Sequence, residues 1–242
     1  MRAKAAAHIN KKSVITWRSH EPSRLETFSD AVFAFALTLI IVSIEAPKSF
    51  DDLFETMKGT LSFAACFSML FLIWNSQNVF FRRYGLNDNR TVLLNAILLF
   101  VVLVYVYPMK FLSMLLFTNH NYVHEGQVLQ IGMKDGQTTT LMLIYGLGYS
   151  VIYALFYLMY RNANRQAKQL ELTPREIFET KTISTINLVS VLIGILAMAM
   201  ALILPKEYSG YSGFFYFLIP ICYTFWFSYR GKKARQKFAT TG

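Results

Sequence analysis

The sequence predicts an all-α membrane protein that crosses the bilayer six times, and three observations support this fold class. Hydrophobic residues make up 54% of the 242 residues and charged residues only 16%, against roughly 25% in an average soluble domain. The apolar residues gather into six runs, each near the length of about 20 residues that a spanning helix needs. Basic residues are concentrated in every second gap between those runs. A soluble core of this size cannot hide so much apolar surface, whereas lipid lets apolar side chains face outward.

The predicted spans are distributed along the whole chain. They cover roughly Thr27–Ile44, Thr60–Phe81, Thr91–Met109, Thr139–Tyr160, Ile183–Leu204 and Gly213–Tyr229. The end of the third span is ambiguous, because Pro108 and Lys110 precede another apolar stretch, Phe111–Phe117. We place Lys110 at the outer interface, and the stretch after it either continues the helix at a kink or lies along the surface.

Basic residues set the predicted orientation. The segment before the first span, the second and fourth gaps, and the tail are rich in Lys and Arg, whereas the alternate gaps hold few basic residues. By the positive-inside rule, both ends of the chain are cytoplasmic. This topology also accounts for the net charge of +10, so we do not expect nucleic acid as a partner.

Three parts of the chain are expected from this topology. Residues 1–22 form a basic cytoplasmic arm, residues 23–229 a six-helix transmembrane domain, and residues 230–242 a basic cytoplasmic tail. The arm lacks the cleavage pattern of a signal peptide. Its basic residues and Trp17 either touch anionic lipid headgroups or belong to a disordered tail.

The first span begins with several polar residues. Ser23 followed by Glu26 predicts a capping box that starts the helix before the apolar run. Asp30 enters the apolar part, where an acid is costly unless it is paired or wet. Arg24 lies six positions earlier, roughly 120° away around the helix axis. We therefore expect Asp30 to reach another helix or another subunit, the alternative being an acid that snorkels to water.

One face of the first span mixes small, bulky and hydroxyl-bearing side chains. It comprises Arg24, Phe28, Ala31, Phe35, Thr38, Leu39 and Val42, with Glu45 at its outer edge. In one interpretation, the small residues let neighbouring helices approach closely. In the other, the face lines a pore between identical subunits, where apolar rings gate by dewetting and Thr38 offers hydroxyl oxygens to a cation. Helical periodicity alone does not separate these interpretations.

The start of this helix resembles a known channel signature. Residues 24–30 fit the pattern Arg-x-x-x-Phe-Ser-Asp, which resembles the signature of the bacterial relatives of the lysosomal transmembrane potassium channel. The second span resembles that family in Trp74, followed by Phe81, Arg82 and Arg83, and the third in Leu93, Leu94, Asn95 and Pro108. The resemblance covers roughly residues 22–110.

The resemblance implies a potassium-preferring cation channel and not an enzyme. It implies a homotetramer in a bacterial inner membrane, with six helices per subunit, no re-entrant pore loop, no cofactor, and potassium as the permeant ion. The first helix of each subunit would line the pore, with constriction and polar layers at Phe35, Thr38, Leu39, Val42 and Ala31. A polar network at the inner ends of the helices would comprise Arg24, Phe28, Ser29, Asp30, Trp74 and Gln77.

Two positions depart from the family's pattern. Phe35 replaces a smaller aliphatic residue, so four inward rings would close a pore more tightly, or the helix would rotate to bring Ala31 or Thr38 to the axis. Gln77 stands where the second helix usually carries a His. Because Gln cannot become cationic, any pairing with Asp30 must be a neutral hydrogen bond or be absent.

Other candidate sites are weaker. His120 and His124 lie four apart, but their surroundings indicate a loop, and a metal site needs three or four convergent ligands. Acidic residues of the first outer loop either attract cations to a pore mouth or are simply solvated; these are Asp51, Asp52 and Glu55, with Glu45 nearby. The two cysteines lie in apolar runs, so no disulfide framework is expected.

Two other functions remain open from the sequence. A proton-coupled secondary transporter needs an ionisable residue near the bilayer midplane, and the candidates Asp30 and Lys110 both lie near the interfaces. A membrane scaffold or lipid-binding protein is supported only by the basic arms and aromatic belts.

Overall fold

The computed structural model describes most of the chain. The described residues are 17–18, 21–42, 49–50, 54, 57, 60–117, 121–124, 127–130 and 137–238. Within them lie α2 (Arg24–Val42), α4 (Thr60–Tyr84), α5 (Asn89–Phe117), β1 (Asn121–His124), β2 (Gln127–Gln130), α6 (Gln137–Arg165), α7 (Pro174–Ile203), the 3-10 helix η1 (Lys206–Phe217) and α8 (Leu218–Phe238). The predicted all-α architecture with six long helices is confirmed.

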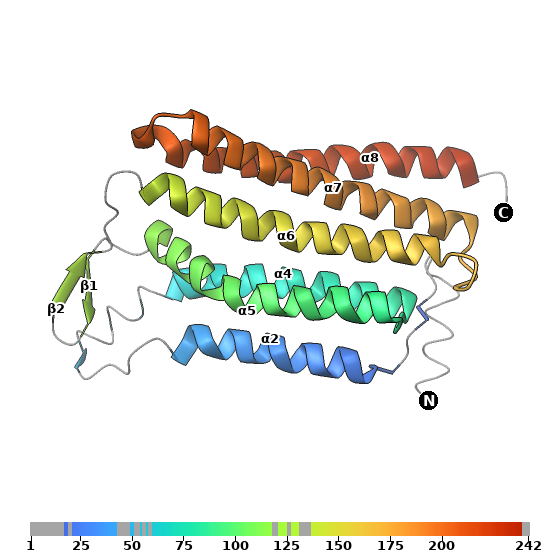
Figure 1. The fold of residues 1–242 in the computed structure, drawn as a ribbon, viewed down its shortest axis with the longest axis horizontal. Coiled ribbons are helices and arrows are strands. Elements are labelled where there is room, and N and C mark those ends of the chain that lie inside the picture. Colours follow the sequence, from blue (N-terminus) through green and yellow to red (C-terminus); the bar gives the residue numbers. More distant parts are fainter. Residues whose placement is uncertain are drawn as a thin grey trace.

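The six helices lie side by side along the long axis of the molecule (Figure 1). Because the chain passes along the bundle an even number of times, α2 begins and α8 ends at the same end of it. We call this the basic end, since basic residues stand in the last turns of α4, α6 and α8. The β1–β2 hairpin lies at the opposite end (Figure 1).

The helices form two groups of three. In the first half, α2, α4 and α5 all contact one another. In the second half, α7 contacts both α6 and α8, and η1 contacts all three helices. The halves are joined mainly by packing of α5 on α6, with a smaller contact between α4 and α6.

The surface of the bundle is strongly apolar. Large hydrophobic side chains are exposed on every long helix, including Phe35, Leu72, Phe100, Leu147, Leu192 and Phe225. Such a surface suits lipid, where apolar groups face outward at no cost, and not water. Four helices are long and apolar enough to cross a membrane by themselves, namely α4, α5, α6 and α7. Within the described residues α2 does not meet that criterion, since Arg24, Glu26 and Asp30 stand in its first seven positions.

Helix ends differ from the predicted spans for identifiable reasons. Of the two alternatives for the third span, the structure shows the first, because α5 continues through Pro108 to Phe117. At the basic end, α7 begins well before the predicted Ile183 because Thr173 and Glu176 form a capping box. Each side chain accepts a hydrogen bond from the other residue's backbone N–H, which fixes the first turn at Pro174.

The predicted sixth span, Gly213–Tyr229, starts too early. Its first residues belong to η1, and the α-helix begins only at Leu218. A 3-10 helix has three residues per turn, so side chains at i and i+3 eclipse one another. Here those positions are aromatic, and successive rings of Tyr208, Tyr211, Phe214 and Phe217 stack at 6.0, 5.9 and 5.9 Å between centroids. At its other end α8 continues to Phe238, through most of the expected tail.

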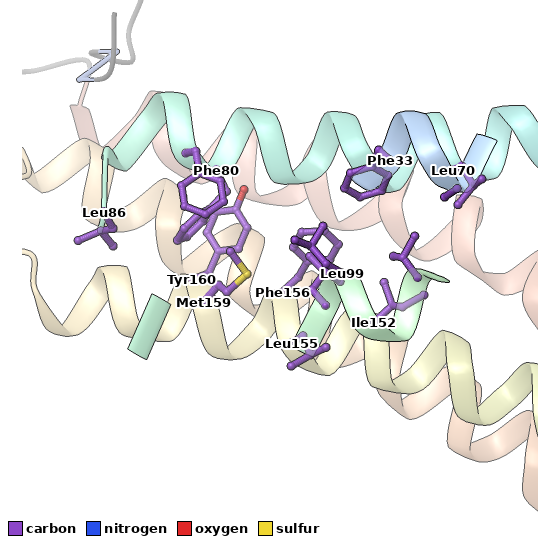
Figure 2. Packing of buried hydrophobic residues seen from close by; sticks show 14 of the residues in the cluster. Phe33, Leu70, Phe80, Leu86, Leu99, Ile152, Leu155, Phe156, Met159 and Tyr160 are labelled. Carbon is purple, nitrogen blue, oxygen red and sulfur yellow. The ribbon is translucent and has the colours of Figure 1, made fainter. Parts of the chain in front are cut away.

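The main core lies between the first half and α6. Phe33 of α2, Leu70 and Phe80 of α4, Leu99 of α5 and several residues of α6 point into it (Figure 2). Near the basic end, Phe80 packs edge-on against Tyr160 at 5.2 Å between ring centroids. These rings fix how α4 sits on α6 and so how the two halves meet.

At the hairpin end, the expected loop around His120 is partly a β-hairpin. The backbone of Asn121–His124 pairs antiparallel with Gln127–Gln130, and His124 stands opposite Gln127. His120, the side chain of His124, and the acidic residues Glu45, Asp51, Asp52 and Glu55 lie outside the described residues. Cys66 and Cys222 are both free thiols.

Candidate pore helix and its anchoring contacts

The start of α2 is fixed by the predicted capping box. The Glu26 backbone N–H donates to Ser23 Oγ at 3.2 Å, and the Ser23 backbone N–H donates to Glu26 Oε1 at 3.0 Å. Two backbone donors that a helix start leaves unpaired are thereby satisfied. The apolar part of α2 thus follows a defined first turn.

One face of α2 is buried against α4 and α5. Ser29, Phe33, Ala36 and Ile40 lie on it, each at most 3% exposed. Their spacing of three to four residues is that of a single helical face. The small residues Ser29 and Ala36 bring α2 close to its neighbours, and the two larger side chains fill the core.

The opposite face of α2 is uncovered. Phe28 and Phe35 are 61% and 57% exposed, and Arg24, Ala31 and Thr38 are also exposed. These belong to the face that we singled out from the sequence. Among the described residues, this face is therefore not closely packed on a helix of the same subunit.

The two remaining positions of that face differ. Leu39 is half-buried at the border between the covered and uncovered faces. Val42 closes the helix, but its side chain lies outside the described residues. The uncovered face is thus defined by Arg24, Phe28, Ala31, Phe35 and Thr38.

Thr38 places a hydroxyl oxygen on the uncovered face. Its Oγ1 donates to the Ala34 carbonyl oxygen at 2.9 Å. The hydroxyl proton is used inside the helix, so the lone pairs of the oxygen stay available to accept or to coordinate. A hydroxyl held in this way presents partial negative charge outward.

Asp30 reaches another helix of the same chain, as its position on α2 predicted. Its Oδ1 accepts a hydrogen bond of 2.7 Å from the indole Nε1–H of Trp74 on α4. The acid is exposed, and the indole supplies a donor without a charge. Arg24 makes no ion pair with Asp30 in the described part of the chain.

Gln77 pairs with Asn95 and not with Asp30. Gln77 Nε2 donates to Asn95 Oδ1 at 2.7 Å, and Asn95 Nδ2 donates to Ser29 Oγ at 2.9 Å. Ser29 Oγ in turn donates to the Leu25 carbonyl at 2.8 Å. All three side chains are at most 2% exposed, so this polar chain joins α4, α5 and α2 inside the first half.

Comparison with known proteins shows the family to which this chain belongs. The family model described as endosomal/lysosomal potassium channel TMEM175 matches residues 24–106, which comprise α2, α4 and most of α5. A protein from Marivirga tractuosa named "Potassium channel" is 39% identical over 218 residues, covering 87% of this chain and 88% of that protein. This chain belongs to the TMEM175 potassium channel family.

A solved structure extends the likeness beyond the residues that the family model matches. A crystal structure of a variant of the potassium channel MtTMEM175, bound to a Nanobody-MBP fusion protein, matches with a TM-score of 0.76 and 38% identity. It covers 88% of this chain and 96% of that one. A second relative, "Potassium channel Cha6605_3372" from Chamaesiphon minutus, is 27% identical over 101 residues, covering 38% of this chain and 50% of that protein. The family and these relatives are channels, not enzymes.

In this TMEM175 chain, ion pairs at the basic end join the two halves. Arg18 donates to both carboxylate oxygens of Glu176 on α7, at 3.0 and 3.1 Å, and its backbone N–H donates to the Arg82 carbonyl of α4. Arg83 of α4 forms a second ion pair across the halves, with Glu179 at 2.9 Å. The segment that precedes the pore helix candidate is therefore tied to the second half.

Sequence reasoning missed part of this arrangement. Asn95, which links the polar chain, was noticed only as part of a resemblance, and its partners are not readable from spacing along α5. The capping role of Glu176 can be read from the sequence, since Thr173-Pro-Arg-Glu has the capping-box pattern. Nothing in the sequence connects Arg18 to a residue 158 positions later.

Proposed function

We propose that this chain forms a homotetrameric, potassium-preferring channel whose central pore is lined by α2 of each subunit. The observation that carries the proposal is the uncovered face of α2, which lies on the helix where the TMEM175 family model begins. Four copies of that face around an axis would enclose a pore without a re-entrant loop. The names of the relatives support potassium as the permeant ion.

The chemistry of the face supports conduction through narrow apolar layers. Phe35 and Thr38 are three residues apart, which separates their layers by about 4.5 Å along the helix. Rings of apolar side chains strip part of an ion's hydration and gate by dewetting, and hydroxyl oxygens replace part of the lost water. A closed pore at Phe35 would have to widen or wet before potassium passed to the Thr38 layer.

The anchoring contacts give α2 a fixed support. The buried chain from Ser29 through Asn95 to Gln77, together with the Asp30–Trp74 hydrogen bond, ties the basic end of α2 to α4 and α5. In the proposed channel these contacts hold the basic end of the pore helix in register. Arg24 and Phe28 are exposed beside them and would meet a neighbouring subunit.

The proposed setting is a bacterial inner membrane. All six long helices would span it, and the basic end, with both termini of the chain, would face the cytoplasm by the positive-inside rule. The parts of the chain would then be a cytoplasmic arm over residues 1–22, the channel domain over residues 23–229 and a cytoplasmic tail over residues 230–242.

Reconstitution tests the proposal directly. The purified protein is placed in liposomes with a potassium gradient, and ion flux and single-channel current are recorded. Ohmic current that reverses near the potassium equilibrium potential supports the channel. Electrically silent uptake that requires a proton gradient would contradict the channel and indicate a proton-coupled secondary transporter. The absence of any transport would favour a membrane scaffold.

A further inference from the structure

A pocket at the basic end combines three arginines with apolar walls. Its volume is about 290 Å³, and its lining includes Arg90, Leu93 and Leu94 of α5 and Leu158, Arg161 and Arg165 of α6. The pocket lies where α5 of the first half meets α6 of the second, and no residue of α2 lines it. No acidic side chain is among the residues that line it.

The three arginines lack an ion-pair partner among the described residues. Arg90, Arg161 and Arg165 are all exposed, and none of them forms an ion pair there. By contrast, Arg18 and Arg83 at the same end are each paired with a glutamate. Three guanidinium groups around one pocket repel each other, so an anion that bridges them is favoured.

Asp88, the acidic residue nearest to Arg90 along the chain, is hydrogen-bonded to other side chains. Asp88 accepts hydrogen bonds from Thr91 Oγ1 at 2.6 Å and from Asn162 Nδ2 at 3.1 Å. Burial by itself raises the pKa of Asp88, but hydrogen bonds from Thr91, Asn162 and Gln166 outweigh it and lower the pKa. Asn162 also lines the pocket, so this contact turns its amide donors toward the carboxylate and leaves recognition of an anion to the arginines.

The walls of the pocket continue into an apolar track. Leu93 is exposed, and Ile97, Phe100 and Val104 follow it on α5 at helical spacing, all of them exposed as well. The arginines stand at the ends of the predicted spans, where headgroups meet acyl chains. A single ligand could therefore place a phosphate over the arginines and an acyl chain along α5.

We propose that this pocket binds the phosphate headgroup of an anionic glycerophospholipid, whose acyl chain lies along α5. Basic pockets between membrane helices bind anionic headgroups through such contacts. Arg is the suitable residue, since its planar fork pairs with two phosphate oxygens at once. The bound lipid bridges α5 and α6, and thereby the two halves of the subunit.

Native mass spectrometry of the full-length protein in detergent tests this inference. Phosphatidylglycerol and phosphatidylcholine are titrated separately, and the bound lipid is counted. We expect retained phosphatidylglycerol and little phosphatidylcholine. Each Arg→Gln change in the pocket should weaken binding about fivefold, and the triple variant Arg90→Gln, Arg161→Gln, Arg165→Gln by about 100-fold, from the typical contribution of one basic residue near an anionic surface.

The matched control removes three positive charges from the same end of the molecule. Lys232→Gln, Lys233→Gln, Arg235→Gln alters exposed residues of α8 that do not line the pocket. Unchanged phosphatidylglycerol binding in this control supports a defined site. Equal loss in both triple variants would mean general attraction to a basic surface and would overturn the proposal.

Two further measurements keep the inference testable. If the triple variant fails to fold, the single variants are compared, because each removes only one exposed side chain. Inorganic phosphate is added as a competitor. If millimolar phosphate displaces phosphatidylglycerol and binds equally well alone, the pocket recognises a free anion and the lipid assignment is wrong. If phosphate has no effect, the acyl chain contributes and the assignment stands.

Discussion

The two halves of the subunit use different means to hold three helices together. In the first half, α2, α4 and α5 are joined by a buried chain of polar side chains and leave one face of α2 uncovered. In the second half, α6 and α7 approach so closely that glycines are required. A Cβ added at Gly194 would lie 2.3 Å from Ser150 Oγ, and one at Gly146 would lie 2.2 Å from Met198 Cγ.

The difference indicates that the first half fixes the orientation of α2, whereas the second half provides dense helix packing. Hydrogen bonds between specific side chains fix the rotation of α2 about its axis, which decides what the uncovered face presents. Glycine contacts fix distance and give dense packing, but they present nothing chemical to an ion. The family model covers the first half, which fits the idea that the specific chemistry lies there. Perturbing each half should therefore separate stability from conduction.

The largest expected effect on stability comes from Gly194→Leu in the second half. The Cβ alone would lie 2.3 Å from Ser150 Oγ and 3.1 Å from Tyr149 Cδ1, and the rest of the leucine has no room there, so α6 and α7 must move apart at a cost of about 3 kcal/mol or the protein fails to fold. Thermal unfolding in detergent measures it. Gly231→Leu is the control, since nothing lies within 4 Å of the added Cβ. Equal behaviour of the two variants would contradict close packing of α6 on α7.

A smaller loss of stability is expected from Arg18→Gln, which breaks an ion pair between the two halves. Glu176 is 1% exposed and would lose both of its hydrogen bonds from the Arg18 guanidinium, so we expect about 2 kcal/mol of destabilisation. The comparison variant is Arg175→Gln, whose exposed pair with Glu179 should contribute only about 0.3–0.5 kcal/mol. Chemical or thermal unfolding compares them, and a larger effect of Arg175→Gln would refute this ranking.

Asn95→Leu should destabilise the first half by about 1–2 kcal/mol. The buried Gln77 amide loses its acceptor, and an unsatisfied buried donor costs more than the hydrogen bond itself contributes. Adding Gln77→Leu should recover most of the loss, because both partners are then apolar. Unfolding midpoints of the single and double variants provide the check. A double variant less stable than Asn95→Leu would show that the polar chain is not the cause.

The smallest effect on stability, and the largest on conduction, is expected at the uncovered face. Phe35→Ala and Thr38→Ala remove exposed groups, so unfolding should change by less than about 0.5 kcal/mol. In liposomes, Phe35→Ala should raise single-channel conductance several-fold, and Thr38→Ala should weaken the preference for potassium over sodium. If both variants conduct like the parent protein, the face contacts lipid or a neighbouring helix instead of the ion.

The sequence predicted those features that depend on local physics. Ser23 and Glu26 define a helix start by their spacing, and the cost of a lone acid beside apolar residues favours a partner for Asp30 on another helix or subunit over an acid that snorkels to water. The partner itself was not predictable, since whether Trp74 or Gln77 meets Asp30 depends on the rotation of α4. The start of α8 was misplaced because hydropathy does not distinguish an α-helix from a 3-10 helix with stacked rings.

The contacts at the basic end also set an order for biosynthesis. Ser29 can meet Asn95 once the chain has been made as far as α5, 66 residues later. Arg18 must wait for Glu176, which is translated 158 residues later, or about 8–30 s at ordinary rates of synthesis. The polar chain of the first half can therefore form before Glu176 has been translated. The Arg18–Glu176 ion pair therefore forms only on a subunit whose α7 has already been made.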